Sequence, residues 1–276
     1  MIRFFRIYSA FFKQQVKSLI EYKLDFAAGM VALGFQQVAS FLVLFAVFSQ
    51  IQAIGSYSFD EMLLFFGWAQ LMKGFDHVYN DNIWTVGWWR IRDGSFSQFL
   101  IRPLGIVSQI VMERVQFDGL GEFLIGLLIF IYAFIRTGLR FSFGDWLVFG
   151  YFFLCGLVIY FALKLLGASV AFWTISSGEL MTVTYEIGSF TRYPLDMYKS
   201  AIIRSLLIYV LPFALVTWVP MVWFIREPQF IADILGIPWA RGSALLGFTG
   251  GLTLILLGLS VGTWKAGLRR YNATGT

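Results

Sequence analysis

Long apolar stretches dominate this sequence, and they constrain the fold more than any other feature. A bilayer core about 30 Å thick needs roughly 20 consecutive apolar residues for one helical crossing. The chain of 276 residues is 58% hydrophobic and only 13% charged, which leaves too little polar surface for a soluble globule. Six stretches are long enough to cross, at about 26–49, 62–83, 118–135, 146–172, 201–225 and 242–263.

These stretches predict an all-α integral membrane protein with six transmembrane helices. A backbone in lipid must satisfy its hydrogen bonds within helices or a closed barrel, and the stretches are too long and uniformly apolar for barrel strands. Residues 1–276 are therefore expected to form a single transmembrane domain. The amphipathic segment 1–25 is expected to lie in the interface, and the short segment 226–241 to lie in or dip into the outer interface.

The distribution of lysine and arginine predicts which side of the membrane each loop faces, because cytoplasmic loops carry the excess of these residues. The N-terminus, the segments 84–117 and 173–204, and the C-terminal tail hold most of the basic residues outside the spans. Both termini are therefore expected in the cytoplasm, and residues 226–241 on the outer side.

Several classes of activity lack their sequence signatures. The chain has no G-x-x-x-x-G-K-[ST] phosphate loop, no G-x-S-x-G nucleophile elbow and no H-E-x-x-H zinc motif. Its single cysteine, Cys155, and single histidine, His77, are too few for an internal disulfide or a histidine-based zinc site. We therefore expect no enzyme activity, no catalytic residue, and no metal or cofactor bound by this chain. The net charge of +5 is attributed to loops that face anionic lipid, and not to nucleic-acid binding.

A basic and aromatic segment, WWRIRDGSFSQFLIRPLG at 88–105, interrupts the apolar pattern. The spacing predicts two short interfacial helices over 84–105 with a break at Gly94, because glycine tolerates the conformation of a sharp turn. Two apolar stripes are expected to rest on the membrane surface, and the polar residues between them to face the cytosol, where they meet lipid headgroups or a groove of another protein. The stripes are Trp84, Trp88 and Ile91, then Phe96, Phe99 and Leu100, and the cytosolic residues are Arg90, Arg92 and Asp93.

Charged residues inside the second span are costly in a bilayer and mark a functional or structural site. Lys73 and Asp76 are three residues apart and are expected to pair on one helical face. The pair is either part of a transport path or a self-neutralised pair packed against a neighbour such as Glu122. Lys164, late in the fourth span, is expected to extend its long side chain to the inner interface.

Prolines and glycines predict the shape and packing of the last two spans. Pro212 and Pro220 each remove a backbone hydrogen bond and are expected to kink the fifth span. Small residues four apart let helices approach closely, so one face of the sixth span is expected to pack inside the subunit, with dimerisation as the alternative. This face consists of Gly247, Gly251, Gly258 and Gly262.

Three motifs, in this order, resemble one transporter family. The motif RIRDGSFSQFLIRPLG is similar to the cytoplasmic segment of type-2 ABC exporter permeases, particularly the six-span bacterial multidrug and viologen exporters. The run LLGASVAFWT at 165–174 is similar to part of their fourth span, and residues 192–220 resemble their Arg-Tyr-Pro and paired-proline pattern. The residues that carry the first motif are Arg92, Gly94, Leu100, Arg102 and Pro103. Lys73 and Lys164 depart from the family's pattern.

The resemblance implies that the chain is one of two membrane halves, identical or paralogous, in the cytoplasmic membrane of a bacterium. Two ABC ATPase subunits would hold ATP and Mg²⁺, so this chain would bind neither. Residues 1–25 would be the elbow helix, 84–103 the coupling helix and 226–241 the outer cap. The residues implied to couple to the ATPase are Arg90, Arg92, Asp93, Gly94, Arg102 and Pro103.

The same resemblance implies an export path between the two halves, along faces of spans one, two and five. The candidate path residues are Phe65, Trp68, Lys73, Asp76, Tyr209 and Pro212. Because Phe, Trp and Met surfaces adapt to varied ligands, we expect a lipophilic or amphipathic substrate. Two alternatives remain open: an ion-coupled secondary transporter that uses Lys73, Asp76 and Glu122, and a non-transporting membrane scaffold.

Overall fold

The computed structural model describes residues 17, 23–226, 228–237 and 242–271. The amphipathic helix predicted over residues 1–25 lies almost entirely outside the described residues, and so does the end of the 226–241 segment. Every regular element among the described residues is helical, apart from one isolated bridge between Ile54 and Tyr57. The predicted all-α class is therefore confirmed.

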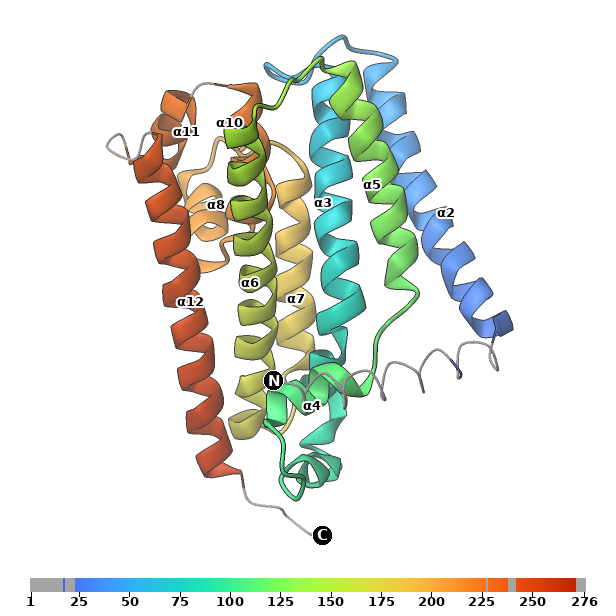
Figure 1. Ribbon diagram of the computed structural model, residues 1–276, viewed down its shortest axis with the longest axis vertical. Coiled ribbons are helices and arrows are strands. Elements are labelled where there is room, and N and C mark those ends of the chain that lie inside the picture. Colours follow the sequence, from blue (N-terminus) through green and yellow to red (C-terminus); the bar gives the residue numbers. More distant parts are fainter. Residues whose placement is uncertain (1–16, 18–22, 227, 238–241, 272–276) are drawn as a thin grey trace.

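Long helices stand side by side along the height of the molecule (Figure 1). One end, called the inner end below, carries the segment 84–105 and helix α4 (Ile106–Glu113). The opposite, outer end carries the two loops at 49–58 and 137–142. The long helices are α2 (Lys23–Phe48), α3 (Phe59–Asn80), α5 (Gly119–Arg136), α6 (Phe143–Thr174) and α12 (Ser243–Arg270), and a shorter one is α7 (Gly178–Ser189).

Among the described residues, α2, α5, α6 and α12 are both long and apolar enough to cross a bilayer. The span count of six stays a prediction, because α3 carries charged residues and α7 has only 12 residues.

Capping determines where two of the helices begin. Ser58 and Glu61 form a capping box at the start of α3, and Ser142 and Asp145 form another at the start of α6.

Helices α3 and α5 pack with their backbones in contact. A Cβ atom added at Gly67 of α3 would lie 2.5 Å from the backbone nitrogen of Phe130 in α5, closer than real side-chain carbons approach. Gly74 of α3 and Gly126 of α5 likewise face backbone atoms of the opposite helix. Residues seven apart lie on one helical face, so these glycines let the two helices approach closely.

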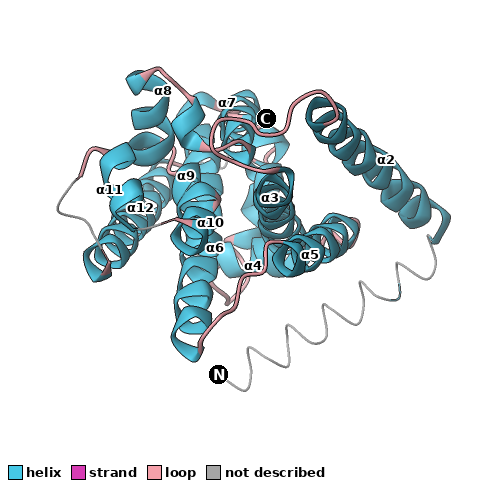
Figure 2. Ribbon diagram, turned by 90° about the horizontal axis from the view of Figure 1, so that it is seen from above, coloured by secondary structure: helices cyan, strands magenta, loops and turns pink. Residues whose placement is uncertain are grey.

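Helix α2 stands apart from the rest of the bundle along one side (Figure 2). Large apolar side chains on its outward faces are exposed, as at Phe35, Leu42 and Phe45. Leu44 and Gln37 are buried where the helix meets the bundle. This exposed apolar surface suits α2 to contact lipid or another subunit.

The prediction of one continuous span over 201–225 is wrong. The helix is interrupted by a turn at Leu211 and Pro212, because the proline has no N–H with which to continue it. Pro220 has no N–H to donate to the carbonyl of Val216, and the helix breaks one residue after Val216, at Thr217, so the kink expected at Pro220 is confirmed. The stretch forms four short helices, α8 (Ala201–Ser205), the π-helix η6 (Leu206–Val210), α9 (Phe213–Val216) and α10 (Trp218–Ile225).

The prediction that residues 173–204 form a cytoplasmic loop is wrong as well. Helix α7 rises from the inner end beside α6 (Figure 1). The chain that follows it reaches the outer half, where the Tyr57 hydroxyl donates a hydrogen bond to Asp196 at 2.9 Å. Glu179 and Glu186 interrupt the apolar pattern of α7, which explains why a search for apolar stretches missed it. The excess of lysine and arginine on the inner side, from which the orientation was predicted, is therefore smaller than the sequence suggested.

A further short helix, α11 (Pro228–Leu235), lies at the outer end beside α10 (Figure 1). Ile231, Ala232 and Leu235 are buried on one of its faces. With only eight residues it is too short to cross a bilayer, as the sequence predicts for this segment.

Candidate functional site

The segment 84–105, called the coupling segment below, forms compact turns at the inner end between α3 and α4 (Figure 1). The chain here contains the 3-10 helix η1 (Asp81–Ile83), the π-helix η2 (Val86–Arg90) and the 3-10 helix η3 (Ser95–Phe99). Gly94 has a φ of 74° between η2 and η3, in the left-handed region that favours glycine. The break predicted at this glycine is therefore confirmed.

Aromatic side chains attach the coupling segment to the ends of α6 and α12. Phe96 is fully buried, and its ring centroid lies 5.3 Å from that of Phe172 in α6 and 6.0 Å from that of Trp264 in α12. Phe99 is fully buried too, and Trp88 packs over the start of α7. The expectation that Phe96 and Phe99 rest on the membrane surface is wrong, because the subunit itself encloses both rings. Buried rings of this size supply a large contact area between the segment and the helices.

Arg90 lies within the coupling segment and does not point toward the cytosol. Its guanidinium forms an ion pair with Glu113 of α4, donates to the Thr85 hydroxyl at 2.6 Å and lies 4.9 Å from the centroid of the Phe99 ring. Only 12% of the side chain is exposed. The predicted orientation of Arg90 is therefore wrong. Sequence reasoning missed Glu113, because nothing in the local pattern shows that α4 folds back against η2.

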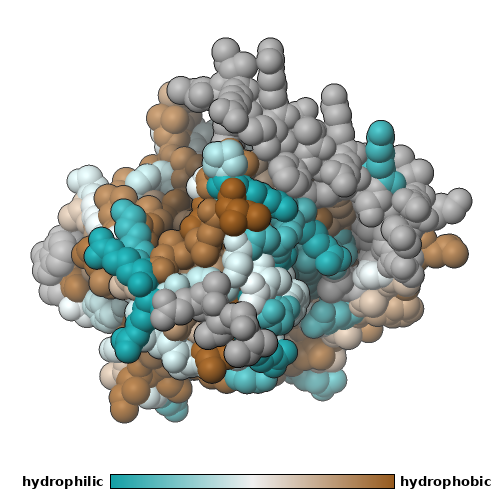
Figure 3. Space-filling view, turned by 90° about the horizontal axis from the view of Figure 1, so that it is seen from below, coloured by the Kyte–Doolittle hydropathy of each residue, from teal (hydrophilic) through white to brown (hydrophobic). Residues whose placement is uncertain are grey.

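The outward side of the coupling segment is exposed at the inner end. Arg92 and Asp93 are exposed, as the sequence predicts, and so are Arg102 and Pro103. Hydrogen bonds from Ser95 lower the pKa of Asp93, so its carboxylate is charged at neutral pH. Figure 3 views this end of the molecule and shows hydrophilic surface mixed with hydrophobic side chains. The large apolar side chains exposed on the segment are Trp89, Leu100 and Ile101.

A network of charged side chains joins α3, α5 and α6 near the inner end. Lys73 of α3 pairs with Glu122 of α5 at 3.0 Å, and Asp76 of α3 pairs with Lys164 of α6 at 2.7 Å. The predicted pairing of Lys73 with Asp76 is therefore wrong, although Glu122 is a neighbour that we expected here. The two ions of α3 face different helices, so they hold α3 on two sides.

His77 and Asp81 extend this charge network toward the coupling segment. Lys164 also contacts Asp81, the first residue of η1, at 2.7 Å. His77 lies 3.2 Å from Glu122 and 3.5 Å from Asp81. The prediction that Lys164 extends to the inner interface is wrong, because two carboxylates enclose its ammonium group and only 1% of the side chain is exposed. Among the described residues, no group of His, Cys, Asp and Glu side chains is arranged to hold a metal ion.

Two glutamines connect α2 to the same network. The amide nitrogen of Gln37 in α2 donates to Glu122 at 3.4 Å, and the amide nitrogen of Gln70 in α3 donates to the carbonyl oxygen of Gln37. Both side chains are buried. Sequence reasoning missed this contact, and the available signal was the presence of amide side chains, Gln37 among them, within two largely apolar stretches.

Most of the chain matches one protein family. Residues 35–275 match the family model for ABC-2 family transporter proteins, and the match includes the coupling segment and the whole charge network. The chain belongs to the ABC-2 transporter family. No curated protein and no solved structure gives a significant match. An ABC-2 permease is a membrane subunit and not itself catalytic, so this permease is a multi-pass membrane protein that associates with an ABC ATPase.

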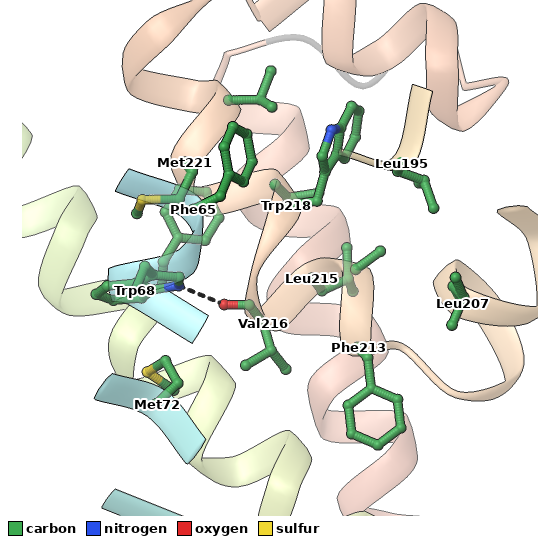
Figure 4. Close-up of a cluster of buried hydrophobic side chains, with 14 of the residues drawn as sticks. Phe65, Trp68, Met72, Leu195, Leu207, Phe213, Leu215, Val216, Trp218 and Met221 are labelled. Carbon is green, nitrogen blue, oxygen red and sulfur yellow. Dashed lines mark hydrogen bonds between the residues drawn. The ribbon is translucent and has the colours of Figure 1, made fainter. Parts of the chain in front are cut away.

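Most path candidates of this ABC-2 permease lie inside the subunit. Phe65 and Trp68 are 1% and 0% exposed, and the Trp68 indole donates to the backbone carbonyl of Val216 at 2.7 Å (Figure 4). These side chains are enclosed in the single subunit, and their assignment to a path between two subunits stays a prediction. The enclosed candidates are Phe65, Trp68, Asp76 and Pro212. Lys73 and Tyr209 keep exposed fractions of 35% and 42%.

The glycine face of α12 in this permease points away from the subunit. A Cβ atom added at any of its four glycines would meet nothing within 4 Å. Helix α12 packs on α6 through the opposite face, where the Tyr151 hydroxyl donates to the carbonyl of Leu246 at 2.6 Å and Thr253 is buried. Packing of the glycine face inside the subunit is therefore a wrong prediction, and dimerisation through it stays a prediction. The four glycines are Gly247, Gly251, Gly258 and Gly262.

Proposed function

We propose that this ABC-2 permease is the membrane subunit of an ATP-driven exporter in a bacterial cytoplasmic membrane. Two copies, or this chain and a paralogue, would enclose a path for a lipophilic or amphipathic compound, and each would engage one ATPase. The observation that carries the proposal is the two-sided coupling segment. One side is exposed at the inner end, and the other side is fixed to several helices.

The contacts behind the coupling segment suit it to transmit motion. Arg90 joins it to α4, Phe96 joins it to α6 and α12, and Asp81 joins its start to Lys164 of α6. Packed interiors have low compressibility and transmit strain. A displacement of the exposed side would therefore move these helix ends together. ATP hydrolysis on the partner would supply the displacement, and this chain would supply the stiff connection.

The exposed side of the coupling segment suits a cleft with an apolar floor and an acidic rim. Leu100 and Ile101 are 48% and 84% exposed and would occupy the floor. Arg92 and Arg102 are exposed on the same segment and would meet the rim. Apolar anchors buried at the centre of an interface contribute most of its affinity, and rim charges contribute specificity and association rate.

The ion-coupled alternative would use the charge network of Lys73, Asp76 and Glu122. Each of these charges has an oppositely charged partner within 3.0 Å, which favours a structural clamp over a relay. Membership of an ABC transporter family also favours an ATP-driven mechanism over both the ion-coupled transporter and the scaffold.

Charge reversal on the exposed side tests the proposal in a complex purified with the ATPase that accompanies the permease from its host. The double variant R92E/R102E should lower transport and transport-coupled ATP hydrolysis by roughly tenfold or more, as expected for lost interfacial charge pairs. Arg269, exposed near the inner end of α12, provides the matched control R269E. Normal activity of the double variant, equal loss in R269E, or the absence of any co-purifying P-loop ATPase would reject the assignment.

A further inference from the structure

A cavity between α2 and α3 contains a positive charge that the coupling mechanism does not use. Its volume is about 240 Å³, and it lies against the 3-10 helix η4 (Phe190–Arg192). The walls are mostly apolar, and the guanidinium-bearing side chain of Arg192 contributes to them. The other walls include Ser40, Val43, Leu44, Met62 and Phe66.

The cavity lies below the outer end of the helices, within the height of the bundle. Met62 and Phe66 follow the start of α3 by three and seven residues, and Leu44 precedes the end of α2 by four. At about 1.5 Å per residue, the cavity is therefore ~5–10 Å below the outer end. A cation at this depth beside apolar walls is unfavourable unless an anion or water compensates it.

Arg192 forms no ion pair with any residue that the structure describes. Arg90 and Arg226, in contrast, pair with Glu113 and Glu61. The nearest carboxylate to Arg192 along the chain is that of Asp196, which accepts hydrogen bonds from the side chains of Tyr57 and Trp218. The guanidinium therefore remains available to a ligand. Its planar fork of donors matches a carboxylate or a phosphate in two-point contact.

We propose that this cavity binds the anionic group of an amphipathic molecule, with Arg192 as the counter-ion. The apolar walls at Val43, Leu44 and Phe66 would contact the hydrocarbon next to the acid. The inference rests on the proposed export function and deepens it, because it names the substrate class as an organic acid with an apolar body. An anionic lipid headgroup has the same chemistry, so the test must separate a transported acid from a membrane lipid.

A matched pair of fluorescent probes tests the recognition of charge. Dansyl-undecanoic acid and its methyl ester have the same apolar body and differ in the acidic group. Each is titrated into phosphatidylcholine nanodiscs that contain the full-length permease. The acid should bind the wild type roughly tenfold or more tightly than the ester, the ratio expected for one charge-assisted hydrogen-bonded pair. Equal binding of the two probes to the wild type overturns the inference.

Three variants locate the site. R192Q should lower the affinity for the acid to that for the ester without changing ester binding, and R192K should keep a preference for the acid. V43W adds bulk at an exposed position on the cavity wall, so it should weaken binding of both probes. R140Q removes a charge from an exposed residue of the outer loop and should change neither affinity. An equal loss of both probes in R192Q, unchanged binding in V43W, or the same loss in R140Q contradicts the site.

Competition and turnover separate the two sources of the anion. If the ligand is a lipid headgroup, replacing part of the phosphatidylcholine with phosphatidylglycerol displaces the acid from the wild type but not from R192Q. If the ligand is transported, the acid stimulates ATP hydrolysis by the permease with its ATPase, and R192Q abolishes the stimulation. If R92E/R102E loses the coupled ATP hydrolysis but still binds the acid more tightly than the ester, the site is supported independently of the export mechanism. If the wild type shows coupled ATP hydrolysis but binds the acid and the ester equally, the site is wrong and the export function stands.

Discussion

Lys164 of α6 and Asp76 of α3 form an ion pair of 2.7 Å in which the two side chains are 1% and 2% exposed. Asp81 shares the same ammonium group at 2.7 Å, so one lysine compensates two carboxylates. Pairs enclosed in this way add little net stability compared with apolar residues, but removal of one partner leaves an uncompensated charge. Helix α3 is therefore dependent on Lys164 for its position against α6.

Replacing Lys164 with methionine should destabilise the permease by about 3–5 kcal/mol, because Asp76 would remain buried without a cation. The midpoint of thermal unfolding in detergent measures the effect. The matched control is K73M, which should cost less because the Lys73 side chain is 35% exposed and His77 also contacts Glu122. Addition of D76N to K164M should restore part of the loss. Equal destabilisation by K164M and K73M would show that burial of an ion pair does not determine how much stability is lost when its lysine is removed.

Gly74→Ala and Gly126→Ala should each destabilise the contact between α3 and α5 by roughly 1–3 kcal/mol, because the added methyl group meets backbone atoms. Gly251→Ala on α12 is the control, since its Cβ enters open space. Alanine there should be neutral or stabilise the helix by up to about 1 kcal/mol. Thermal unfolding of the three variants gives the comparison, and similar midpoints for all three would contradict this packing.

Arg90 and Arg92 should respond differently to replacement with alanine, although they are two residues apart. R90A removes the contacts with Glu113, Thr85 and Phe99, so amide hydrogen exchange in η2 and η3 should accelerate by roughly tenfold or more. R92A should leave exchange unchanged and lower only the ATP-coupled activity. Faster exchange in R92A, or normal exchange in R90A, would reverse the roles assigned to the two arginines.

Trp68→Phe should destabilise the permease by about 1–3 kcal/mol, because it leaves the buried carbonyl of Val216 without its hydrogen-bond donor. This bond joins α3 to the chain that follows the turn at Pro212. Trp146→Phe on α6 makes the same chemical change at a side chain that is 53% exposed, and it should cost less than half as much. Chemical or thermal unfolding of both variants decides the point, and equal effects would contradict it.

Features that depend on local pattern were predictable from the sequence. The all-α class follows from the apolar stretches, the break at Gly94 from its place between two aromatic clusters, and the exposure of Arg92 from its position beside that break. Both ends of α6 and the start of α12 were close to their predicted positions, because the same residues that make a stretch apolar also make it helical. The end of α12 was missed, because the helix continues past the apolar stretch to Arg270.

Features that depend on which helices are neighbours were not predictable. Lys73 could pair with Asp76 by spacing alone, yet α5 and α6 supply nearer partners for both. The glycine spacing on α12 favours close packing as strongly as that of Gly67 and Gly74 on α3, but only the α3 glycines meet another helix. Helix α7 escaped detection because Glu179 and Glu186 interrupt its apolar run.

The polar contacts that α2 makes with other helices, among the residues described, are those of Gln37, which lies near the midpoint of the helix. Apolar contacts also attach α2 to the bundle near its outer end, at Leu44 and Phe48. The inner half of α2, which has neither kind of contact among the residues described, is therefore the part from which we expect the largest displacement when a second subunit approaches.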